Sequence, residues 1–564
     1  MTNRFNILKT ILKVAPEGKG PKQARQFTTS VAALGLVLAT AACGTPDPKL
    51  PEGAIGFVGG FLGGVVADEP RAALAGRDIL SRGGTAADAA AAMYFTMSVT
   101  LPSRAGLGGG GMCVVFDVES GTTQVLDFTA PQPNSVSAST SRPSAIPGNP
   151  RGFFALQARH GQLLWREVIA PAEQLARFGH PTSRAFARDL QAVGPALLSD
   201  PGARAMFAGK SGVQVAAEGE TIEQVDLAST LGMLRARGVG PLYVGPYART
   251  FVAAVNAAGG SLSVEDLRSF APIWRDSVRV NVGNEVAHFA PPPAAASTVA
   301  AVMLALLEAN DDYDTSDLGV RAHLISETGL RAFSDRETWL SANGQGTQAA
   351  STLVTSARIQ ALSQGLRSDR RTSVSAFATK PKNRNESPSS TGFSAADAFG
   401  NAVSCAVTMN SAFGTGRVAQ GTGVLLAAAP DVSGRGPIGL APMLLVNENS
   451  KEFRLAATAS GGVAAPSALA GVVANMVLAG DDLNTALARP RVHLNGDPDI
   501  TYYEPGLDQG AQSYLSNAGH RIQAVREIGL VNALYCPAGL PTTPETCDMA
   551  VDPRGVGLAS GSMR

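Results

Sequence analysis

The sequence predicts a mixed fold of helices and strands, in which a long first part and a shorter second part meet at a polar junction near residue 390. Residues 68–100 have the apolar spacing of helices, whereas the residues after 390 alternate as strands do. The composition, 45% apolar and 16% charged, is typical of a globular chain and not of a disordered one. A chain of 564 residues is long enough for two to four domains or one large composite fold.

The N-terminal residues are typical of a targeting segment. Residues 1–26 are rich in Lys and Arg, with Glu17 as the only acid, and the apolar run "VAALGLVLATAAC" follows at residues 31–43. This run is too short to span a bilayer comfortably and ends in small residues, so residues 1–43 are predicted to be a signal peptide. The Cys after "TAA" is similar to the lipobox of bacterial lipoproteins, in which the thiol of the first mature residue, here Cys43, is acylated. The alternative is an ordinary cleaved signal with an incidental Cys.

Residues 44–63 are predicted to be a tether. Together with the signal, they predict a protein of the bacterial cell envelope, periplasmic and lipid-anchored, with no membrane contact except the anchor.

Helices and short strands are expected in the first part, and residues 266–308 are expected to run through strands into a helix. The helical pattern of residues 68–100 breaks at Gly83–Gly84, and Thr85 is a candidate N-cap for the helix that follows. The glycine-rich residues 106–111, "GLGGGG", then lead into two strands joined by the turn "ESGT". Further helices are expected in "FALQARHGQLLWREVIAPAEQLARFG", "DLASTLGMLRARG" and "HLISETGLRAFSDRETWL".

The second part begins after a soft polar segment, "ATKPKNRNESPSS", at residues 378–390. Strands are expected at 393–396, 402–409, 443–446 and 453–457, and a helix at 464–478. The stretch "ASGG", residues 459–462, lies between a strand and this helix. It is either a simple turn or a site at which exposed N–H groups bind an anion or oxyanion.

Several function classes are disfavoured. Lys+Arg and Asp+Glu both number 46, so the net charge is zero and nucleic-acid binding is not expected. The "GLGGGG" stretch matches a dinucleotide fingerprint, and Asp127 lies downstream, but a helix precedes it and a strand follows, which is the reverse of the required order. No zinc-type spacing and no G-x-S-x-G elbow occur, so no metal, no cofactor and no Ser-His-Asp triad is predicted.

The cysteines fall into two groups after Cys43. Cys536 and Cys547 flank a Pro- and Thr-rich loop, which makes a disulfide between them plausible in an oxidising compartment. Cys113 and Cys405 lie in apolar, strand-like runs and are expected to be buried small hydrophobes.

The polar junction is either an ordinary loop or a self-cleavage site. In N-terminal-nucleophile hydrolases the precursor is cut immediately before a Ser, Thr or Cys, whose new α-amine then serves as its base. Such a site requires a flexible segment upstream and a strand that holds the nucleophile, and residues 378–396 supply both.

The chain resembles the γ-glutamyltransferase family, also called γ-glutamyl transpeptidases, over about residues 64–560. The similar stretches, in order, include "GGTAADAAAAMYFTMSVTLPSRAGLGGGGMCVVFD", "FSDR", "GNAVSCAVTMNSAFGTGRVAQGTGVLL", "SGG", "RPRVH" and "DPRGVG". The resemblance implies an α+β fold, the four-layer αββα sandwich of N-terminal-nucleophile (Ntn) hydrolases. It implies a large segment, 64–389, and a small segment, 390–564, that form a heterodimer after the cut and act on a small amide or peptide substrate.

The resemblance also assigns catalytic residues. With Phe393 and Ser394 fixing the register, Ser390 takes the nucleophile position, Thr391 the next, and Gly392 replaces the family's His. Thr391 is the nucleophile only if the strand shifts by one residue, which would turn every side chain to the opposite face. Thr408 matches the Thr that assists the nucleophile, Asn410 a substrate-binding Asn, and Gly461 with Gly462 the oxyanion glycines.

The glutamyl-binding positions depart from the family pattern. Thr129 occupies the place of the Arg that binds the α-carboxylate, and Asp431 is retained while Val432 replaces the Asp that binds the α-amine. Ile438 and Gly439 replace a Ser-Ser pair. Because each charge-assisted bond is worth roughly 1.5–3 kcal/mol, these changes predict much weaker γ-glutamyl binding unless Arg142 or Arg417 compensates.

Two functions remain open. The first is an Ntn hydrolase that cuts itself before Ser390 and then transfers or hydrolyses an acyl group, from γ-glutamyl compounds such as glutathione or from a related amide. The second is a catalytically inactive relative that serves as an envelope-anchored binding or structural protein.

Overall fold

A computed structural model of the chain describes residues 60–136, 140–310, 312–384, 386 and 388–562. The predicted signal peptide, Cys43 and most of the predicted tether lie outside the described residues.

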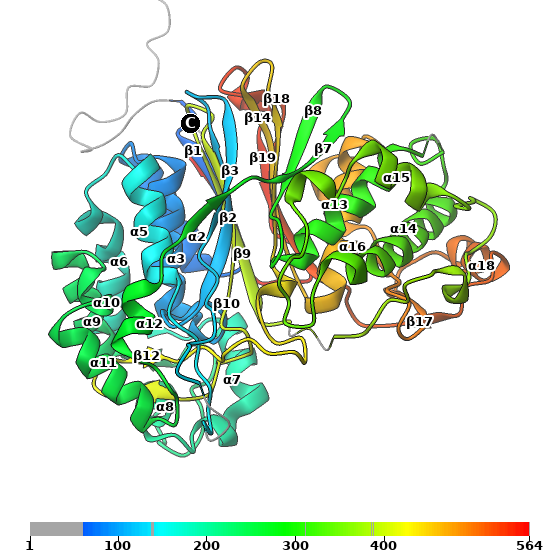
Figure 1. The fold of residues 1–564 in the computed structure, drawn as a ribbon. Coiled ribbons are helices and arrows are strands. Elements are labelled where there is room, and N and C mark those ends of the chain that lie inside the picture. The colour runs from blue at the N-terminus through cyan, green and yellow to red at the C-terminus, as the bar shows by residue number, and fades with distance from the viewer. Residues whose placement is uncertain (1–59, 137–139, 311, 385, 387, 563–564) are drawn as a thin grey trace, which may run out of the picture. The chain divides into compact units, whose positions relative to one another are not determined.

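Two antiparallel sheets form the centre of the described part (Figure 1). The first sheet contains, in spatial order, β20 (Leu558–Ser562), β1 (Gly63–Ala67), β9 (Ser390–Asp397), β10 (Ala402–Thr408), β2 (Gly110–Asp117), β3 (Thr122–Asp127) and β6 (Ile273–Arg275). The second contains β19 (Asp548–Ala550), β18 (Leu530–Leu540), β14 (Glu452–Ser460), β13 (Ala441–Asn447), β8 (Glu285–Phe289) and β7 (Val278–Val282).

Helices cover the outer face of each sheet (Figure 1). On the first sheet lie α2 (Pro70–Ser81), α3 (Ala86–Thr100) and α5 (Asn149–His160), while α6 (Trp165–Phe178) packs on α3 and α9 (Val225–Arg237) packs on α6. On the second lie α13 (Ala295–Glu308) and α16 (Ala465–Val477), and α14 (Leu318–Trp339) packs on both of these helices. The predicted four-layer αββα arrangement, an α+β fold, is therefore confirmed.

The remaining elements are shorter or peripheral. They are α4 (Pro102–Ala105), α7 (Arg184–Leu197), α8 (Pro201–Phe207), α10 (Gly240–Tyr243), α11 (Pro246–Ala257), α12 (Val264–Ser269), α15 (Ser356–Ser363), α17 (Leu483–Ala488), α18 (Gln509–Asn517), β4 (His180–Pro181), β5 (Thr221–Ile222), β11 (Val418–Ala419), β12 (Val424–Leu425), β15 (Val492–His493), β16 (Thr501–Tyr503) and β17 (Ile522–Ala524).

The core is layered in the same way. Phe393 belongs to the apolar cluster between the first sheet and its helices, whereas Ala396 belongs to the cluster between the two sheets. A third cluster, which includes Leu455, lies between the second sheet and its helices. Because side chains alternate along a strand, odd positions of β9 face the helices and even positions face the second sheet.

Local sequence explains how the first helices begin. Thr85 caps α3 and forms a capping box with Asp88, so its predicted capping role is confirmed. After α4, the glycine stretch leads directly into β2, and a Cβ added at Gly110 would lie 2.2 Å from the Ala130 nitrogen. The glycines thus permit close backbone packing ahead of a strand, which is not the arrangement of a dinucleotide loop.

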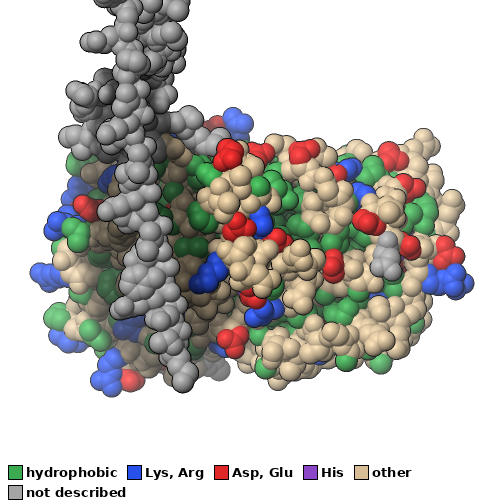
Figure 2. All heavy atoms as spheres, turned by 90° about the horizontal axis from the view of Figure 1, so that it is seen from above, with side chains coloured by type: hydrophobic (Ala, Val, Ile, Leu, Met, Phe, Trp, Pro, Cys, Tyr) green, Lys and Arg blue, Asp and Glu red, His purple; other side chains and the backbone are tan. Residues whose placement is uncertain are grey.

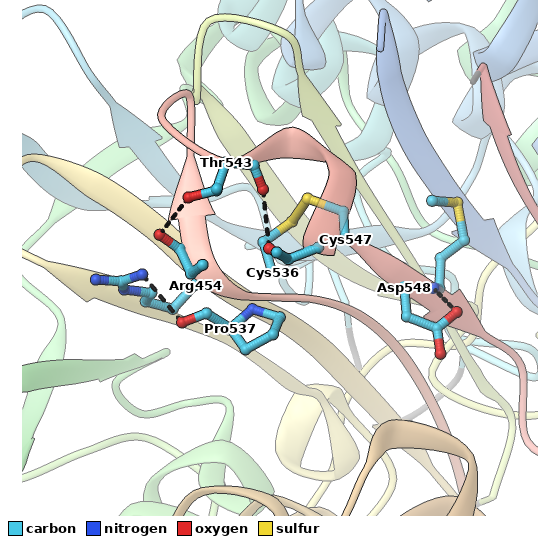
Figure 3. The surroundings of a disulfide bond; sticks show 9 residues. Arg454, Cys536, Pro537, Thr543, Cys547 and Asp548 are labelled. Carbon is cyan, nitrogen blue, oxygen red and sulfur yellow. Dashed lines mark hydrogen bonds between the residues drawn. A yellow bond between two sulfur atoms is a disulfide. The ribbon is translucent and has the colours of Figure 1, made fainter. Parts of the chain in front are cut away.

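The cysteines correct one sequence-based expectation. Cys113 on β2 and Cys405 on β10 are fully buried, as expected, but they are joined by a disulfide. The expectation of two unbonded cysteines was wrong because the β2–β10 register places the two residues directly opposite each other, which the sequence does not reveal. Cys536, within β18, and Cys547, just before β19, form a second disulfide (Figure 3).

The face of the molecule seen in Figure 2 is mixed in charge. On the face seen in Figure 2, acidic and basic side chains are interspersed among the coloured residues, without a large patch of one sign. Within the described ranges, no helix is both long enough and apolar enough to cross a membrane.

Candidate active site

Ser390 is the first residue of β9, a central strand of the first sheet. It lies directly opposite Thr408 of β10, and it is 3% exposed. Its Oγ is buried and has no hydrogen-bond partner among the described residues. A buried hydroxyl without a partner is unusual in a folded protein and is expected to have another role.

Ser390 lies on the face of β9 that is turned toward the second sheet. Gly392, on the same face, packs so closely against β14 that an added Cβ would lie 2.3 Å from Thr458 Oγ1. The place that the resemblance gives to a His side chain is therefore occupied here by Thr458. Thr458 Oγ1, like Ser390 Oγ, is buried without a partner in the described structure.

Thr408 connects the junction to Asn410. Its Oγ1 donates a hydrogen bond to the backbone carbonyl of Ser389 at 3.4 Å and accepts one from the Asn410 N–H at 2.9 Å. The Ser389 carbonyl belongs to the peptide bond that precedes Ser390, so the Thr408 hydroxyl contacts that bond directly.

Gly461 and Gly462 form the turn between β14 and the start of α16. Both have positive φ, 128° and 62°, a conformation that glycine adopts at little cost. A Cβ added to Gly462 would lie 2.7 Å from the carbonyl oxygen of Glu386. The chain upstream of Ser390 thus passes directly against Gly462, whereas Gly461 packs against Gly529.

Helix α14 holds that upstream chain. Arg336, which is 1% exposed, forms a buried ion pair with Glu386 and donates to the Lys382 carbonyl at 2.9 Å. Glu337 pairs with Arg384 at 2.8 Å. The "FSDR" stretch, which includes Arg336, therefore fixes the chain that leads to the junction.

Asn410 has an amide that is only half satisfied. Its φ is 61°, and its Nδ2 donates to the Ala428 carbonyl at 2.9 Å and to the Ala130 carbonyl at 3.4 Å. Its Oδ1 is buried and lacks a partner among the described residues. An acceptor is therefore free beside Thr408, which suits an N–H or O–H of a ligand.

Thr129 is already bound. Its N–H and Oγ1 both donate to Asp127 Oδ1, at 3.0 and 2.8 Å, and Asp127 Oδ2 pairs with Arg275 at 2.8 Å. Thr129 supplies no positive charge, so it does not replace the carboxylate-binding Arg of the family pattern.

Asp431 is also engaged. It accepts from the Ser433 N–H at 2.9 Å and pairs with Arg435 at 2.6 Å, and Val432 is 73% exposed. Burial acts to raise the pKa of Asp431, but hydrogen bonds from Ser433 and the charge of Arg435 lower this pKa below its ordinary value. Arg435 already neutralises the one carboxylate that was retained.

The two arginines considered as substitutes have other contacts. Arg417 pairs with Asp200 at 3.3 Å, and Arg142 donates to the Thr415 carbonyl at 3.3 Å. The structure thus brings together Ser390, Thr408 and Asn410 and sets Gly461–Gly462 along the upstream chain. It does not supply a charged pair for a zwitterionic glutamyl group at the predicted positions.

A triad-like group elsewhere lacks the right chemistry. Ser277 Oγ lies 2.8 Å from His288 Nδ1, and His288 Nε2 lies 3.3 Å from Glu448 without hydrogen-bond geometry. Burial, and then the charge of Arg279, lowers the pKa of His288 to about 3. A base with so low a pKa is weak near neutral pH, so we assign this group no catalytic role. Among the described residues, no three His, Cys, Asp or Glu side chains lie close enough to hold a metal ion.

Sequence reasoning missed two residues beside the junction. Asp68 accepts a hydrogen bond from Thr391, and Thr458 packs on Gly392. Both are far from residue 390 in the sequence, so only strand pairing and sheet stacking bring them there. The sequence offered a clue for Asp68, which is an acid at the end of a short strand, but none for Thr458.

The fold and this site together define an N-terminal-nucleophile hydrolase: an αββα sandwich with a hydroxyl residue at the start of a central strand. A sequence model described as Gamma-glutamyltranspeptidase matches residues 72–432 and 435–562. The chain belongs to the gamma-glutamyltranspeptidase family.

The comparisons with individual proteins agree. The chain is 25% identical to the glutathione hydrolase proenzyme of Escherichia coli strain K12, over 84% of this chain and 88% of the relative. It is 28% identical to the acylase ACY 1 proenzyme of Pseudomonas sp. strain V22, over 86% and 91%. The crystal structure of cephalosporin acylase from Bacillus halodurans has the same fold, with a TM-score of 0.75 and 21% identity over 92% of this chain and 98% of that one.

Proposed function

We propose that the chain cuts itself before Ser390 and then transfers or hydrolyses the acyl group of a small amide through an ester on Ser390. One observation supports this most: a buried Ser390 hydroxyl without a partner lies at the start of β9, and the Thr408 hydroxyl is bonded to the carbonyl of Ser389.

The first reaction is the cut. Ser390 Oγ attacks the carbonyl carbon of Ser389 and its proton passes to the departing nitrogen, so the C–N bond breaks and an ester forms. Water then hydrolyses the ester, which leaves a carboxylate on Ser389 and a free α-amine on Ser390. Thr408 stabilises the charge that develops on the carbonyl oxygen.

The second reaction uses the same groups on a substrate. The freed α-amine takes the proton of the Ser390 hydroxyl, which attacks the amide carbonyl of the substrate, and the amine leaving group takes that proton. We assign the N–H groups of the Gly461–Gly462 turn to the oxyanion, because Gly462 lies against the upstream chain at Glu386 and would be uncovered when that chain leaves. Water or an amine then releases the acyl group from Ser390.

We propose that the preferred acyl group is less charged than γ-glutamyl. Thr129 lacks a positive charge, Val432 lacks a negative one, and Asp431 is neutralised by Arg435. The chain has relatives named as glutathione hydrolases and relatives named as acylases, which supports an amide substrate without specifying the acyl group. Losing charge-assisted bonds worth roughly 1.5–3 kcal/mol each should weaken γ-glutamyl binding about a hundredfold or more.

The cut is tested by electrophoresis of the purified protein after full reduction and denaturation. Wild type should give two pieces, the smaller starting at Ser390. Ser390→Ala should stay whole and Thr391→Ala should still be cut, because in the described structure Ser390 Oγ has no partner whereas Thr391 Oγ1 is bonded to Asp68. A wild-type chain that remains whole would instead support the second hypothesis, an inactive relative, which the replacement of His by Gly392 favours.

Substrate preference is tested on the cut protein with glutathione and a panel of amides with uncharged acyl groups. The proposal expects kcat/KM to be higher for an uncharged acyl group. A clear preference for glutathione over the whole panel would refute the proposed acyl class and leave the self-cleavage proposal standing.

A further inference from the structure

Asp68 lies at the end of β1, beside the first residues of β9. The last ladder pair of the two antiparallel strands is Ala67 with Phe393, so Asp68 follows directly where β1 stops. Beyond this point β1 offers no backbone acceptor to β9, and a side chain must take over.

The Asp68 carboxylate accepts hydrogen bonds from two residues of β9 in place of the β1 backbone. Its Oδ2 accepts hydrogen bonds from Thr391 Oγ1 at 2.7 Å and from the Gly392 N–H at 3.1 Å. Its Oδ1 accepts from the Asn532 side chain of β18 at 2.7 Å. One carboxylate therefore ties the residues after Ser390 to both central sheets.

These contacts distinguish the two adjacent hydroxyls. The Thr391 hydroxyl is held by Asp68, whereas the Ser390 hydroxyl, on the opposite face of the strand, has no partner in the described structure. We propose that Asp68 is a positioning residue that fixes the start of β9, so that Ser390 and not Thr391 is presented for reaction. This inference rests on the proposed self-cleaving function.

Positioning of Ser390 by Asp68 is needed most after the cut. Before it, the peptide chain holds Ser390 from both sides; afterwards Ser390 is a chain terminus, and termini fray unless they are tied down. A misplacement of about 1 Å at a reacting group costs roughly a hundredfold in rate. Asp68 acts through Thr391 and Gly392, so its loss should lower kcat and leave KM nearly unchanged.

The test compares Asp68→Asn with Asp78→Asn. Asp78 is an exposed acid on α2, so its substitution changes the charge equally but away from the site. Asp68→Asn should lower kcat about ten- to a hundredfold with KM within about twofold, and Asp68→Glu should recover part of the loss. Thr391→Val should lower kcat less than Asp68→Asn does. In the Asp68→Asn/Thr391→Val double variant, the fold-loss of kcat should be smaller than the product of the two single losses, because both substitutions remove the same hydrogen bond.

Each outcome is decisive. If the wild type cuts and Asp68→Asn keeps the wild-type kcat, the positioning proposal is wrong and the proposed function stands. If Asp68→Asn raises KM as much as it lowers kcat, or Asp78→Asn loses as much kcat, the effect is not one of position. If the wild type never cuts, both proposals fall.

An independent observation concerns the disulfide between Cys113 and Cys405. Both residues are fully buried, and they lie on opposite sides of Ser390 in the sequence. Cys405 lies on β10, the neighbour of β9, and Cys113 on β2, the next strand of the same sheet. We infer that the two products of the cut stay covalently joined by this bond, an inference that also rests on the proposed cleavage.

The second disulfide provides a matched control, because Cys536 and Cys547 both follow Ser390 and cannot join the two products. Protein alkylated under denaturing conditions is separated with and without reductant. With reductant, two pieces should appear; without it, one species of full length. The Cys113→Ala/Cys405→Ala variant should give two pieces in both lanes, whereas Cys536→Ala/Cys547→Ala should behave as the wild type.

The same gel distinguishes a failure of the cleavage proposal from a failure of the disulfide inference. A single species in the reduced lane of the wild type contradicts the cleavage and, with it, the joined products. Two pieces without reductant contradict only the disulfide inference.

Discussion

At the scale of single residues, Gly392 departs most clearly from the family pattern. A Cβ at this position would lie 2.3 Å from Thr458 Oγ1 and 2.5 Å from Thr458 Cβ. The two positions therefore share one volume between the sheets, and the chain fills it from β14 instead of β9.

This shared volume predicts the effect of substitution. Gly392→Ala should lower the free energy of unfolding by about 1–3 kcal/mol through overpacking. Thr458→Gly in the same chain should recover part of the loss, because it removes the clashing atoms. Denaturant unfolding of the single and double variants measures both effects, and additive losses would contradict a shared volume.

Cys43 is a second residue-scale prediction, which lies outside the described residues. If the lipobox-like stretch directs acylation, wild-type cells should incorporate labelled fatty acid into the protein, and Cys43→Ser cells should not. Labelling that survives Cys43→Ser would rule out this anchor. Secretion of an unlabelled wild-type protein would support the ordinary signal peptide.

At the scale of elements, α14 is joined to the junction by buried charges. Its Arg336 pairs with Glu386, and both side chains are almost completely buried. Removing one partner of such a pair leaves the other charge uncompensated, at a cost of about 3–5 kcal/mol. The upstream chain should therefore leave its place when Arg336 is lost.

The expected result is slow cutting. Arg336→Met should reduce the rate of cleavage before Ser390 about tenfold or more, because the peptide bond is no longer held against Thr408 and the glycine turn. A time course on reduced gels measures the rate. Arg358→Met is the matched control, since Arg358 pairs with Asp335 of the same helix but does not contact the upstream chain in the interactions described. Equal rates for Arg336→Met and wild type would contradict this role of α14.

At the scale of the whole molecule, buried histidines contribute to the response to acid. Burial, and then the charge of Arg336, lowers the pKa of His493 to about 4. Burial, followed by Arg279, lowers that of His288 to about 3, and burial, followed by His323 and Arg371, lowers that of His520 to about 3. The same groups titrate at about 6.5 in the unfolded chain.

Acid lowers the free energy of unfolding because the folded and unfolded chains bind different numbers of protons. Between pH 6.5 and about 4 the unfolded chain binds protons that the folded chain excludes, so the free energy of unfolding falls as the pH falls. Each histidine contributes up to about 1.4 kcal/mol per pH unit in this range, and about 1 kcal/mol between pH 6.5 and 5.5. Denaturant unfolding at pH 6.5 and 5.5 should show the loss, and His493→Gln should reduce it by the share of one histidine. A free energy of unfolding that is unchanged over this interval would contradict the prediction.

Much of the fold followed from local patterns. Helical spacing in residues 68–100 and alternation after 390 correspond to α2, α3, β9 and β10, and the Thr85 cap formed as expected. The predicted strand at 393–396 proved longer, beginning at Ser390, because pairing with β10 extends order to residues whose polar sequence resembles a loop.

By itself, the sequence determined the resemblance to the family, which implies the αββα fold and the nucleophile position at Ser390, because these depend on ordered motifs. The period of apolar residues indicated the helices and strands. Only the tertiary structure decided which hydroxyl is free, which charges the upstream chain meets, and that Cys113 bonds to Cys405. Those features depend on atoms brought together from Asp68, Arg336, Thr458 and Asn532. Register and sheet stacking, which no local pattern encodes, place such distant residues within bonding distance.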